Sequence, residues 1–413
     1  MTLLIDPPNS PGYGRMWSHL ASDESFDELH RFAELIGIPF KGFDRDHYDI
    51  PSTHYERVVA AGATPVSSRE LIARLIRAGL RRRKAQALAP KKPGRTLVRA
   101  NRLTAGDRVA IVSPAGPVTA PRLDAGLAVL TSWGLSVSTM RNVRGRHTEF
   151  GYLSSSDAAR VDDFMRAWCD PDVSAVFCAR GGYGAQRMVD LLDWHELSTA
   201  GPKALVGFSD ITALHQAFAA RLGMSTIHGP VVTSLGAGDD ASRSHLRSML
   251  FTPQEALDLA PAPPEALDLT PAPMESPVES LVAGRAEGVL VGGNLALLAA
   301  SIGTRDSLSA AESIAVLEDV GEELFRLDRL ITQLLRTGWF DGVRGIAVGQ
   351  LTDCGPPDSV RRLFEERLAP LGVPMLWGVP IGHGDRNLAF PFGVPAILDA
   401  DAGTLVLREP ALH

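Results

Sequence analysis

The chain has 413 residues, of which 45% are hydrophobic and 22% charged, and its formal net charge is −7. This length allows two or three domains with substantial cores, and the charge points to neither nucleic acid nor an anionic membrane as a partner. Its three cysteines lack metal-ligand spacing, which argues against a disulfide framework or a zinc site. With no apolar leader and no membrane-spanning stretch, we expect a cytoplasmic protein.

Residues 1–84 read as a small separate α/β domain. Residues 3–5 form an apolar run typical of a strand, and helical patterns cover 25–35 and 68–80. Seven potential metal ligands lie among these elements, and their irregular spacing matches no ligand motif: His19, Asp23, His30, Asp44, Asp46, His47 and Asp49. We interpret them as polar loop residues, and the sequence leaves open whether they bind metal. The segments Ile5-Asp-Pro-Pro-Asn, Trp17-Ser-His-Leu and Arg45-Asp-His-Tyr-Asp resemble a short bacterial domain family of unknown function.

Residues 85–100 are rich in Ala, Pro and Lys and predict an interdomain linker. From 101 to 250, apolar runs alternate with helical patterns. Strands are expected at 108–113, 135–139, 175–179 and 204–208, and helices at 121–133, 156–169, 185–194 and 211–222. Such alternation predicts a doubly wound parallel sheet, in which ligands bind at the carboxyl ends of the strands.

Residues 251–283 interrupt this alternation. They hold a near-duplicate, 255–263 followed by 265–273, whose proline and acid content predicts a flexible insertion. Residues 284–413 then predict a second α/β domain. It begins with the segment Gly288-Val-Leu-Val-Gly-Gly-Asn. Strands are expected at 313–317 and 345–349, with a helix at 323–335 and a terminal hairpin at 396–407.

Ser209 and Asp210 lie where a predicted buried strand turns sharply into a helix. The backbone N–H groups of a helix's first turn are unpaired, so Ser209 could act as a nucleophile whose oxyanion those groups bind. Alternatively, Ser209 or Asp210 simply caps the helix. The stretch alone leaves both interpretations open.

Two further polar residues share this placement at the end of an apolar run. Glu318 directly follows the strand predicted at 313–317, and His383 follows Val379-Pro-Ile-Gly. A serine needs a base, which an imidazole supplies, and a carboxylate fixes the tautomer of that imidazole. Asp319 could replace Glu318 in this role. Gly181 and Gly182, after a third predicted strand, could place backbone N–H groups beside Ser209.

Several motifs occur in order between residues 103 and 408, and together they resemble the LD-carboxypeptidase family. That family includes murein tetrapeptide carboxypeptidases and microcin C immunity peptidases. The motifs are Ser113-Pro-Ala-Gly, Gly151-Tyr-Leu-Ser, Arg180-Gly-Gly-Tyr-Gly, Gly207-Phe-Ser-Asp-Ile-Thr-Ala-Leu, His228-Gly-Pro, Gly292-Gly-Asn-Leu, Leu317-Glu-Asp-Val-Gly-Glu, Arg326-Leu-Asp-Arg and Ile381-Gly-His-Gly. The extension at 1–84 and the duplicated insertion depart from the family.

The resemblance implies an amidotransferase-like α/β domain at 101–250 and a smaller swivelling domain at 284–413, usually in homodimers. It also implies Ser209 as nucleophile, His383 as general base and Glu318 as its partner, without metal or cofactor. The oxyanion hole would use the backbone N–H groups of Asp210 and of Gly181 or Gly182.

Three further residues are candidates for substrate binding. Arg180 either binds the terminal carboxylate of a substrate or forms an ion pair between strands, and Tyr183 and His228 could line the site. His215, in the helix after Ser209, is expected to be a packed core histidine.

We expect a metal-independent serine carboxypeptidase that releases C-terminal D-alanine from muropeptides in peptidoglycan recycling. The alternatives are an immunity-type peptidase acting on aminoacyl-adenylate antibiotics and a non-catalytic peptide-binding protein.

Overall fold

The structure is a computed structural model that describes residues 3–12, 15–44, 46–78, 80, 97–251 and 278–413. The chain divides into a first unit, Met1–Gln86, and a second unit, Ala87–His413. Most of the predicted linker and of the predicted insertion lie outside the described residues. In the part of the chain that is described, no helix has the length and apolar character needed to cross a membrane.

The first unit is a small α/β domain with strands in the order β4-β5-β3-β1-β6, and β2 pairs with β3. Its helix α1 begins where the side chain of Ser25 accepts a hydrogen bond from the backbone of Glu28. Leu29 and Phe32 of this helix pack on Leu20 and Ile50 of the sheet. The elements are β1 Leu3–Ile5, β2 Ser10–Gly12, β3 Arg15–Ser22, α1 Phe26–Leu35, β4 Phe43–Asp44, β5 His47–Pro51, α2 Tyr55–Ala60, β6 Thr64–Pro65 and α3 Ser68–Arg77.

The prediction that the His and Asp residues of this unit lie in loops is wrong for most of them. His19 lies on β3, His47 and Asp49 on β5, Asp44 on β4, and His30 on α1. Along β5 buried and half-exposed residues alternate, and His19 on β3 is half-exposed between two buried residues. Short strands whose exposed face is polar carry too few apolar residues to be recognised as strands from sequence.

The first sheet of the second unit has the order β17-β11-β10-β9-β7-β8. Every pair from β8 to β11 is parallel, which confirms the predicted doubly wound sheet. Counted from β7, the parallel strands run 2-1-3-4-5, an order whose ligands bind at the carboxyl ends of the strands. The elements are β7 Arg108–Val112, α4 Ala120–Ser132, β8 Ser136–Thr139, α5 Asp157–Cys169, β9 Val173–Cys178, α6 Ala185–Val189, α7 Trp194–Thr199, β10 Ala204–Gly207, α8 Thr212–Ala217, β11 Thr226–His228, α9 Val232–Leu235, α10 Asp240–Phe251 and β17 Phe390–Phe392.

Both faces of this sheet are covered, because alternate residues of its strands enter different cores. Val109 of β7 belongs to one buried cluster together with Leu123 of α4. Its neighbour Ala110 belongs to a second cluster with Phe164 and Trp168 of α5. Strands buried on two faces read as continuous apolar runs, which explains why the sequence located them well.

The second sheet has the order β12-β16-β15-β14-β13-β18-β19. Its central strands β13 to β16 are parallel, and the predicted terminal hairpin is present as the antiparallel pair β18 and β19. The elements are β12 Glu279–Val282, β13 Arg285–Asn294, α11 Leu295–Ala300, β14 Ser313–Val320, α12 Leu324–Arg336, β15 Gly345–Thr352, α13 Pro357–Leu368, β16 Met375–Trp377, β18 Pro395–Asp399 and β19 Thr404–Leu407.

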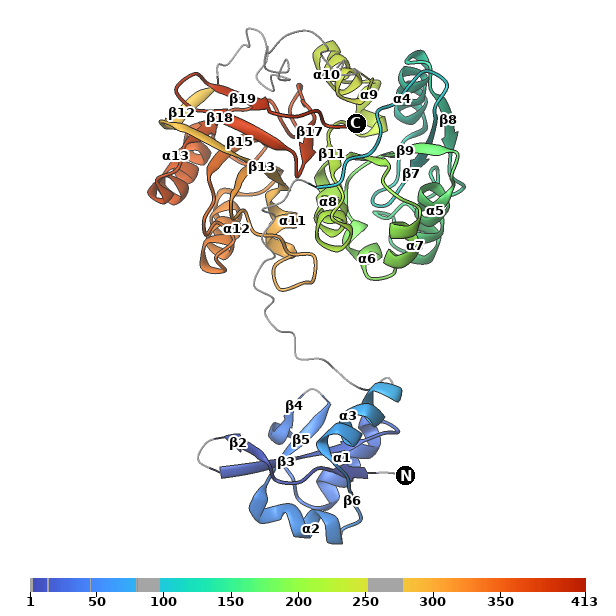
Figure 1. Ribbon diagram of the computed structural model, residues 1–413, viewed down its shortest axis with the longest axis vertical. Helices are drawn as coiled ribbons and strands as arrows, with labels where there is room; N and C mark the ends of the chain where they lie inside the picture. The colour runs from blue at the N-terminus through green and yellow to red at the C-terminus, as the bar shows by residue number, and fades with distance from the viewer. Residues whose placement is uncertain (1–2, 13–14, 45, 79, 81–96, 252–277) are drawn as a thin grey trace. The chain divides into compact units, whose positions relative to one another are not determined.

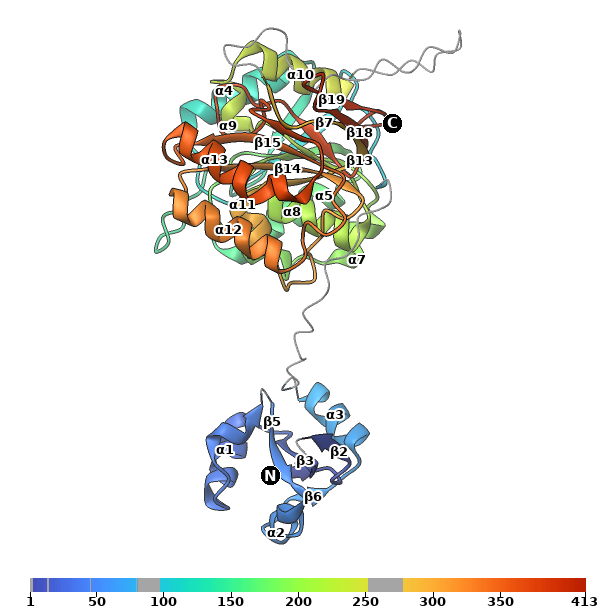
Figure 2. The ribbon, with the colours of Figure 1, turned by 90° about the vertical axis from the view of Figure 1, so that its left-hand side faces the viewer.

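One late strand joins the two halves of the second unit. The chain leaves the second sheet after β16, pairs as β17 with β11 of the first sheet, and returns as β18. Figure 1 shows this red strand beside green β11, where the orange and red half meets the green half. In Figure 2 the orange and red half lies in front of the green half. The loop that carries His383 is therefore anchored to both sheets.

Candidate active site

Ser209 occupies a strained turn directly after β10. Its φ is 65°, a left-handed conformation that is uncommon for a residue with a side chain. The short 3₁₀ turn that begins here has Phe208 as its N-cap and no side-chain cap. The capping interpretation is therefore wrong. The Asp210 carboxylate instead accepts a hydrogen bond from the backbone of Ala185, at 2.7 Å, and so fixes the turn to the start of α6.

Ser209, His383 and Glu318 form one hydrogen-bonded chain. The Oγ of Ser209 lies 2.9 Å from Nε2 of His383, and Nδ1 of the same ring lies 2.6 Å from Oε2 of Glu318. Glu318 is fully buried, whereas the side chain of His383 is 16% exposed. A buried carboxylate therefore holds an imidazole whose other nitrogen faces a partly accessible hydroxyl.

Glu318 lies inside β14 and not after it, so the predicted end of this strand is wrong by three residues. The pairing of β14 with β15 is irregular between Leu317 and Asp319. An irregularity of this kind changes the direction of a side chain relative to that in a regular strand, and here it falls at Glu318. The apolar run ends at Leu317 because the next two residues are acidic, although the backbone continues as a strand.

The structure distinguishes the two adjacent carboxylates. Asp319 accepts hydrogen bonds from the side-chain amide of Asn294 and from the backbone of Ala296, both at 2.9 Å. Its carboxylate thus stabilises the start of α11, where burial raises its pKa to about 6. Glu318 is the neighbour that contacts His383.

The end of β13, which pairs with the strand of Glu318, packs closely against α8, the helix that follows Ser209. The hydroxyl of Thr212, in the first turn of α8, accepts a hydrogen bond from the backbone of Asn294 at 3.0 Å. Asn294 pairs with Glu318 across β13 and β14. At Gly293, a Cβ would come within 2.6 Å of the Thr212 hydroxyl, and φ is 117°. Only glycine allows this approach.

The electrostatics of the site keep Glu318 ionised. Burial acts to raise its pKa, but the imidazoles of His228 and His383 outweigh burial and lower the pKa to about 2. His228 is itself fully buried, stacks on Phe390 at 4.6 Å and places Nε2 3.8 Å from Oε1 of Glu318. This buried position indicates that His228 stabilises the Glu318 carboxylate. It does not favour the contact with substrate that the sequence suggested for His228.

His215 is packed in the core, as predicted. Its ring contacts the Gly207 carbonyl and the Thr226 hydroxyl, both at 2.9 Å. Burial and the neighbouring His228 lower its pKa to about 3. The neutral ring of His215 therefore links β10 to β11, and its contact on β10 is two residues before Ser209.

The glycine loop after β9 lies against Ser209. The Gly181 carbonyl accepts a hydrogen bond from Gly116 at 3.0 Å, and φ of Gly182 is 114°. The buried guanidinium of Arg160 donates to the Gly184 carbonyl at 2.9 Å. Because the loop is fixed in this way, the backbone of Gly181 stays against the Ser209 side chain, and a Cβ on Gly181 would come within 2.8 Å of Cβ of Ser209.

Gly181→Ala should lower kcat by about 10- to 100-fold while the protein stays folded, because it disturbs placement of the nucleophile. A Cβ at this position would lie 2.8 Å from Cβ and 3.1 Å from Oγ of Ser209. Steady-state kinetics and thermal unfolding measure the two effects. Gly42→Ala is the control, since its Cβ would meet nothing closer than 3.7 Å. Equal kcat for Gly181→Ala and wild type would contradict the placement of this loop.

The two remaining substrate candidates lie on the exposed side of the glycine loop. Arg180 donates from Nη1 to the Pro117 carbonyl at 2.8 Å, and not to a carboxylate. Tyr183 is 49% exposed and meets Tyr152 edge to face, with ring centroids 5.7 Å apart. Both side chains are exposed to solvent.

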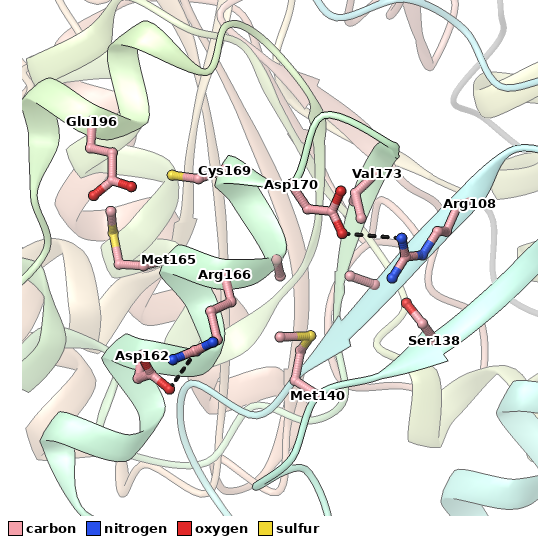
Figure 3. A pocket seen from close by; sticks show the side chains of 12 residues that line it. Arg108, Ser138, Met140, Asp162, Met165, Arg166, Cys169, Asp170, Val173 and Glu196 are labelled. Atoms are coloured by element: carbon pink, nitrogen blue, oxygen red, sulfur yellow. Dashed lines mark hydrogen bonds and ion pairs between the residues drawn. The ribbon is translucent and has the colours of Figure 1, made fainter.

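A cavity of about 570 Å³ lies in the same half of the unit but is separate from this constellation (Figure 3). It is bordered by Arg108 and Val173, which begin β7 and β9. Asp170 pairs with Arg108 there at 3.1 Å. The cavity therefore lies between α5 and the strands β7 to β9, and none of Ser209, Glu318 and His383 lines it.

Comparison with family models gives two matches in the second unit. The LD-carboxypeptidase N-terminal domain matches residues 109–229, and the LD-carboxypeptidase C-terminal domain matches residues 287–398. The chain belongs to the LD-carboxypeptidase family. A model for a protein of unknown function matches residues 3–78 of the first unit.

Individual relatives of this LD-carboxypeptidase agree with that assignment. A putative carboxypeptidase of Streptomyces coelicolor is 50% identical over 77% of this chain and 98% of its own length. The murein tetrapeptide carboxypeptidase of Pseudomonas aeruginosa is 38% identical over 71% of this chain and 94% of its own length. A solved structure of the microcin C7 self immunity protein MccF with aspartyl sulfamoyl adenosine shares the fold. Its TM-score is 0.64 at 23% identity, over 76% of this chain and the whole of that one.

Proposed function

We propose that this LD-carboxypeptidase is a serine-type enzyme that hydrolyses the amide between an L-centre and a C-terminal D-amino acid. The leading substrate is a muropeptide tetrapeptide that ends in D-alanine. The observation that carries the proposal is the chain of contacts from Ser209 through His383 to Glu318, at 2.9 and 2.6 Å. The relatives named for murein peptides support the choice of substrate.

In this proposal the Glu318 carboxylate accepts the Nδ1–H of His383 and so leaves Nε2 free to accept a proton. As Oγ of Ser209 attacks the scissile carbonyl, its proton passes to that nitrogen. The imidazolium then donates the proton to the leaving amine. The amide C–N bond breaks, D-alanine leaves, and the acyl group remains on Oγ of Ser209 as an ester. Water, activated by the same imidazole, hydrolyses the ester and regenerates the hydroxyl.

The negative charge that develops on the carbonyl oxygen needs hydrogen-bond donors. We assign this role to the backbone N–H groups of Asp210 and of Gly181 or Gly182, because Asp210 follows Ser209 and Gly181 borders its side chain. One such donor contributes about 2.7–4 kcal/mol to transition-state stabilisation. Arg180, on the exposed side of the same loop, is the candidate for binding the terminal carboxylate of the substrate.

The substrate assignment is tested with purified protein and three compounds in parallel. They are a tetrapeptide ending in diaminopimelate-D-alanine, the same peptide ending in L-alanine, and aspartyl sulfamoyl adenosine. We expect D-alanine release with kcat/KM at least 100-fold above that for the other two compounds, measured by chromatography. Faster cleavage of the nucleotide would instead identify an immunity-type peptidase. Binding of the tetrapeptide without turnover would identify a non-catalytic peptide-binding protein.

A further inference from the structure

Three potential metal ligands lie on one face of the sheet in the first unit. In the antiparallel pair of β3 and β5, His19 is directly opposite Asp49. His47 is two residues before Asp49, so both side chains leave β5 on the same side, whereas the intervening Tyr48 is buried in the core. One ligand atom from each of the three side chains lies within 4.8 Å of those of the other two. Strand pairing therefore gathers residues whose sequence spacing matches no motif.

A buried carboxylate contacts Nδ1 of each of the two histidines. Nδ1 of His19 lies 2.9 Å from Asp6, and Nδ1 of His47 lies 2.7 Å from Asp46. Both aspartates are 1% exposed. A carboxylate at Nδ1 fixes the tautomer that keeps the lone pair on Nε2, and it raises the basicity of the ring. This is the support that metal-binding histidines commonly have.

The carboxylate behind His19 is itself fixed by the fold. Asp6 accepts hydrogen bonds from the backbone of His19 and from the hydroxyl of Ser68 at the start of α3, both at 2.6 Å. Burial acts to raise the pKa of Asp6, but its hydrogen bonds with His19 and Ser68 outweigh burial and lower the pKa. The ring of His19 is thus held in place by packing and hydrogen bonds from two elements.

We propose that the first unit binds a divalent transition-metal ion of the zinc type through Nε2 of His19, Nε2 of His47 and the carboxylate of Asp49. Two of these atoms already have suitable spacing, because Nε2 of His47 lies 3.3 Å from Oδ1 of Asp49. Ligands at about 2.0–2.1 Å from a tetrahedral zinc lie about 3.3–3.4 Å apart. The ligand atom of His19 lies within 4.8 Å of the other two ligand atoms, so closing the site needs only a small movement of the three side chains.

The donor set and its exposure indicate what kind of ion and site this is. Two imidazoles and one carboxylate suit zinc and its neighbours better than magnesium or calcium, which prefer oxygen ligands. The side chains of His19, His47 and Asp49 are 29%, 13% and 45% exposed. Water therefore reaches the site and can complete the coordination. Three protein ligands with an open position are typical of reactive zinc sites, whereas structural sites are closed by four.

Without metal, the ring of His47 lies between two carboxylates, with Nδ1 2.7 Å from Asp46 and Nε2 3.3 Å from Asp49. The alternative to a metal site is therefore an ion-pair cluster.

The test uses the full-length protein, stripped of metal with a chelator and dialysed into a non-coordinating buffer at neutral pH. Titration calorimetry with zinc chloride should give one Zn²⁺ per chain with a Kd in the micromolar range or tighter. Asp49→Asn and His19→Ala should each weaken binding at least tenfold. Asp6→Asn, which removes only the carboxylate behind His19, should weaken it by about 10- to 100-fold. His54→Ala is the matched control and should leave the affinity unchanged.

Two readouts make the result decisive. Circular dichroism establishes which variants fold, and Asp49→Asn decides the matter if His19→Ala does not, because Asp49 is the most exposed of the three ligands. Cobalt substitution should give the visible absorption of a four-coordinate ion in wild type and lose it in folded Asp49→Asn. Absence of saturable zinc binding, or equal affinity in wild type and Asp49→Asn, would overturn the proposal and leave an ion-pair cluster only.

Discussion

Ser209→Ala should lower kcat for D-alanine release by about a millionfold, as removal of the nucleophile does in other serine hydrolases. The substitution removes the hydroxyl that lies 2.9 Å from the His383 imidazole. The methyl side chain fits the space that the serine occupied, so the thermal unfolding midpoint should change little. Stopped assays with long incubation are required, because the residual rate is very low, although it should still exceed that of the uncatalysed reaction.

The matched control for this variant is Ser132→Ala. Ser132 is exposed at the end of α4, and its hydroxyl donates only to the Val129 carbonyl of its own helix. We expect wild-type kcat in this variant. Retention of the wild-type rate by Ser209→Ala would rule out the proposed serine mechanism. A serine-directed phosphonate provides a second check, because it should label wild type and fail to label either Ser209→Ala or His383→Ala.

Glu318→Gln should lower kcat by about 10⁴-fold with little change in KM, the magnitude known for the equivalent loss in a serine protease triad. The glutamine amide can donate to Nδ1 of His383, which places the ring proton on Nε2. That nitrogen then faces Ser209 as a donor and cannot accept the proton of the nucleophile. Glutamine also lacks the negative charge that stabilises the imidazolium formed during the reaction.

The neighbouring carboxylate supplies the comparison for Glu318→Gln. Asp319→Asn should change kcat less than tenfold and lower the thermal unfolding midpoint, because Asp319 binds Asn294 and the start of α11 instead of His383. Kinetics and thermal unfolding of both variants separate the two roles. A larger loss of kcat in Asp319→Asn than in Glu318→Gln would show that the orienting carboxylate had been assigned to the wrong residue.

The sequence by itself determined the parallel sheet of the second unit and the strand-to-helix turn at Ser209. Its strands are short apolar runs and its helices have clear periodicity, because a parallel sheet buried on both faces leaves a strong local pattern. The turn at Ser209 follows from the same pattern, since the apolar period changes at this residue. Some of the motifs that resemble the LD-carboxypeptidases, among them Ser113-Pro-Ala-Gly and Arg180-Gly-Gly-Tyr-Gly, lie on the loops that follow these strands.

Only the tertiary structure decided which distant groups meet. His383 contacts residues 65 and 174 positions away, and it reaches them because β17 crosses into the first sheet. The distinction between Glu318 and Asp319, and the burial of His228, depend on strand pairing that leaves no local signal. The same holds for His19, His47 and Asp49, which the pairing of β3 and β5 brings together. Local periodicity reflects which side of each element is buried, whereas these contacts depend on how the elements pack against one another.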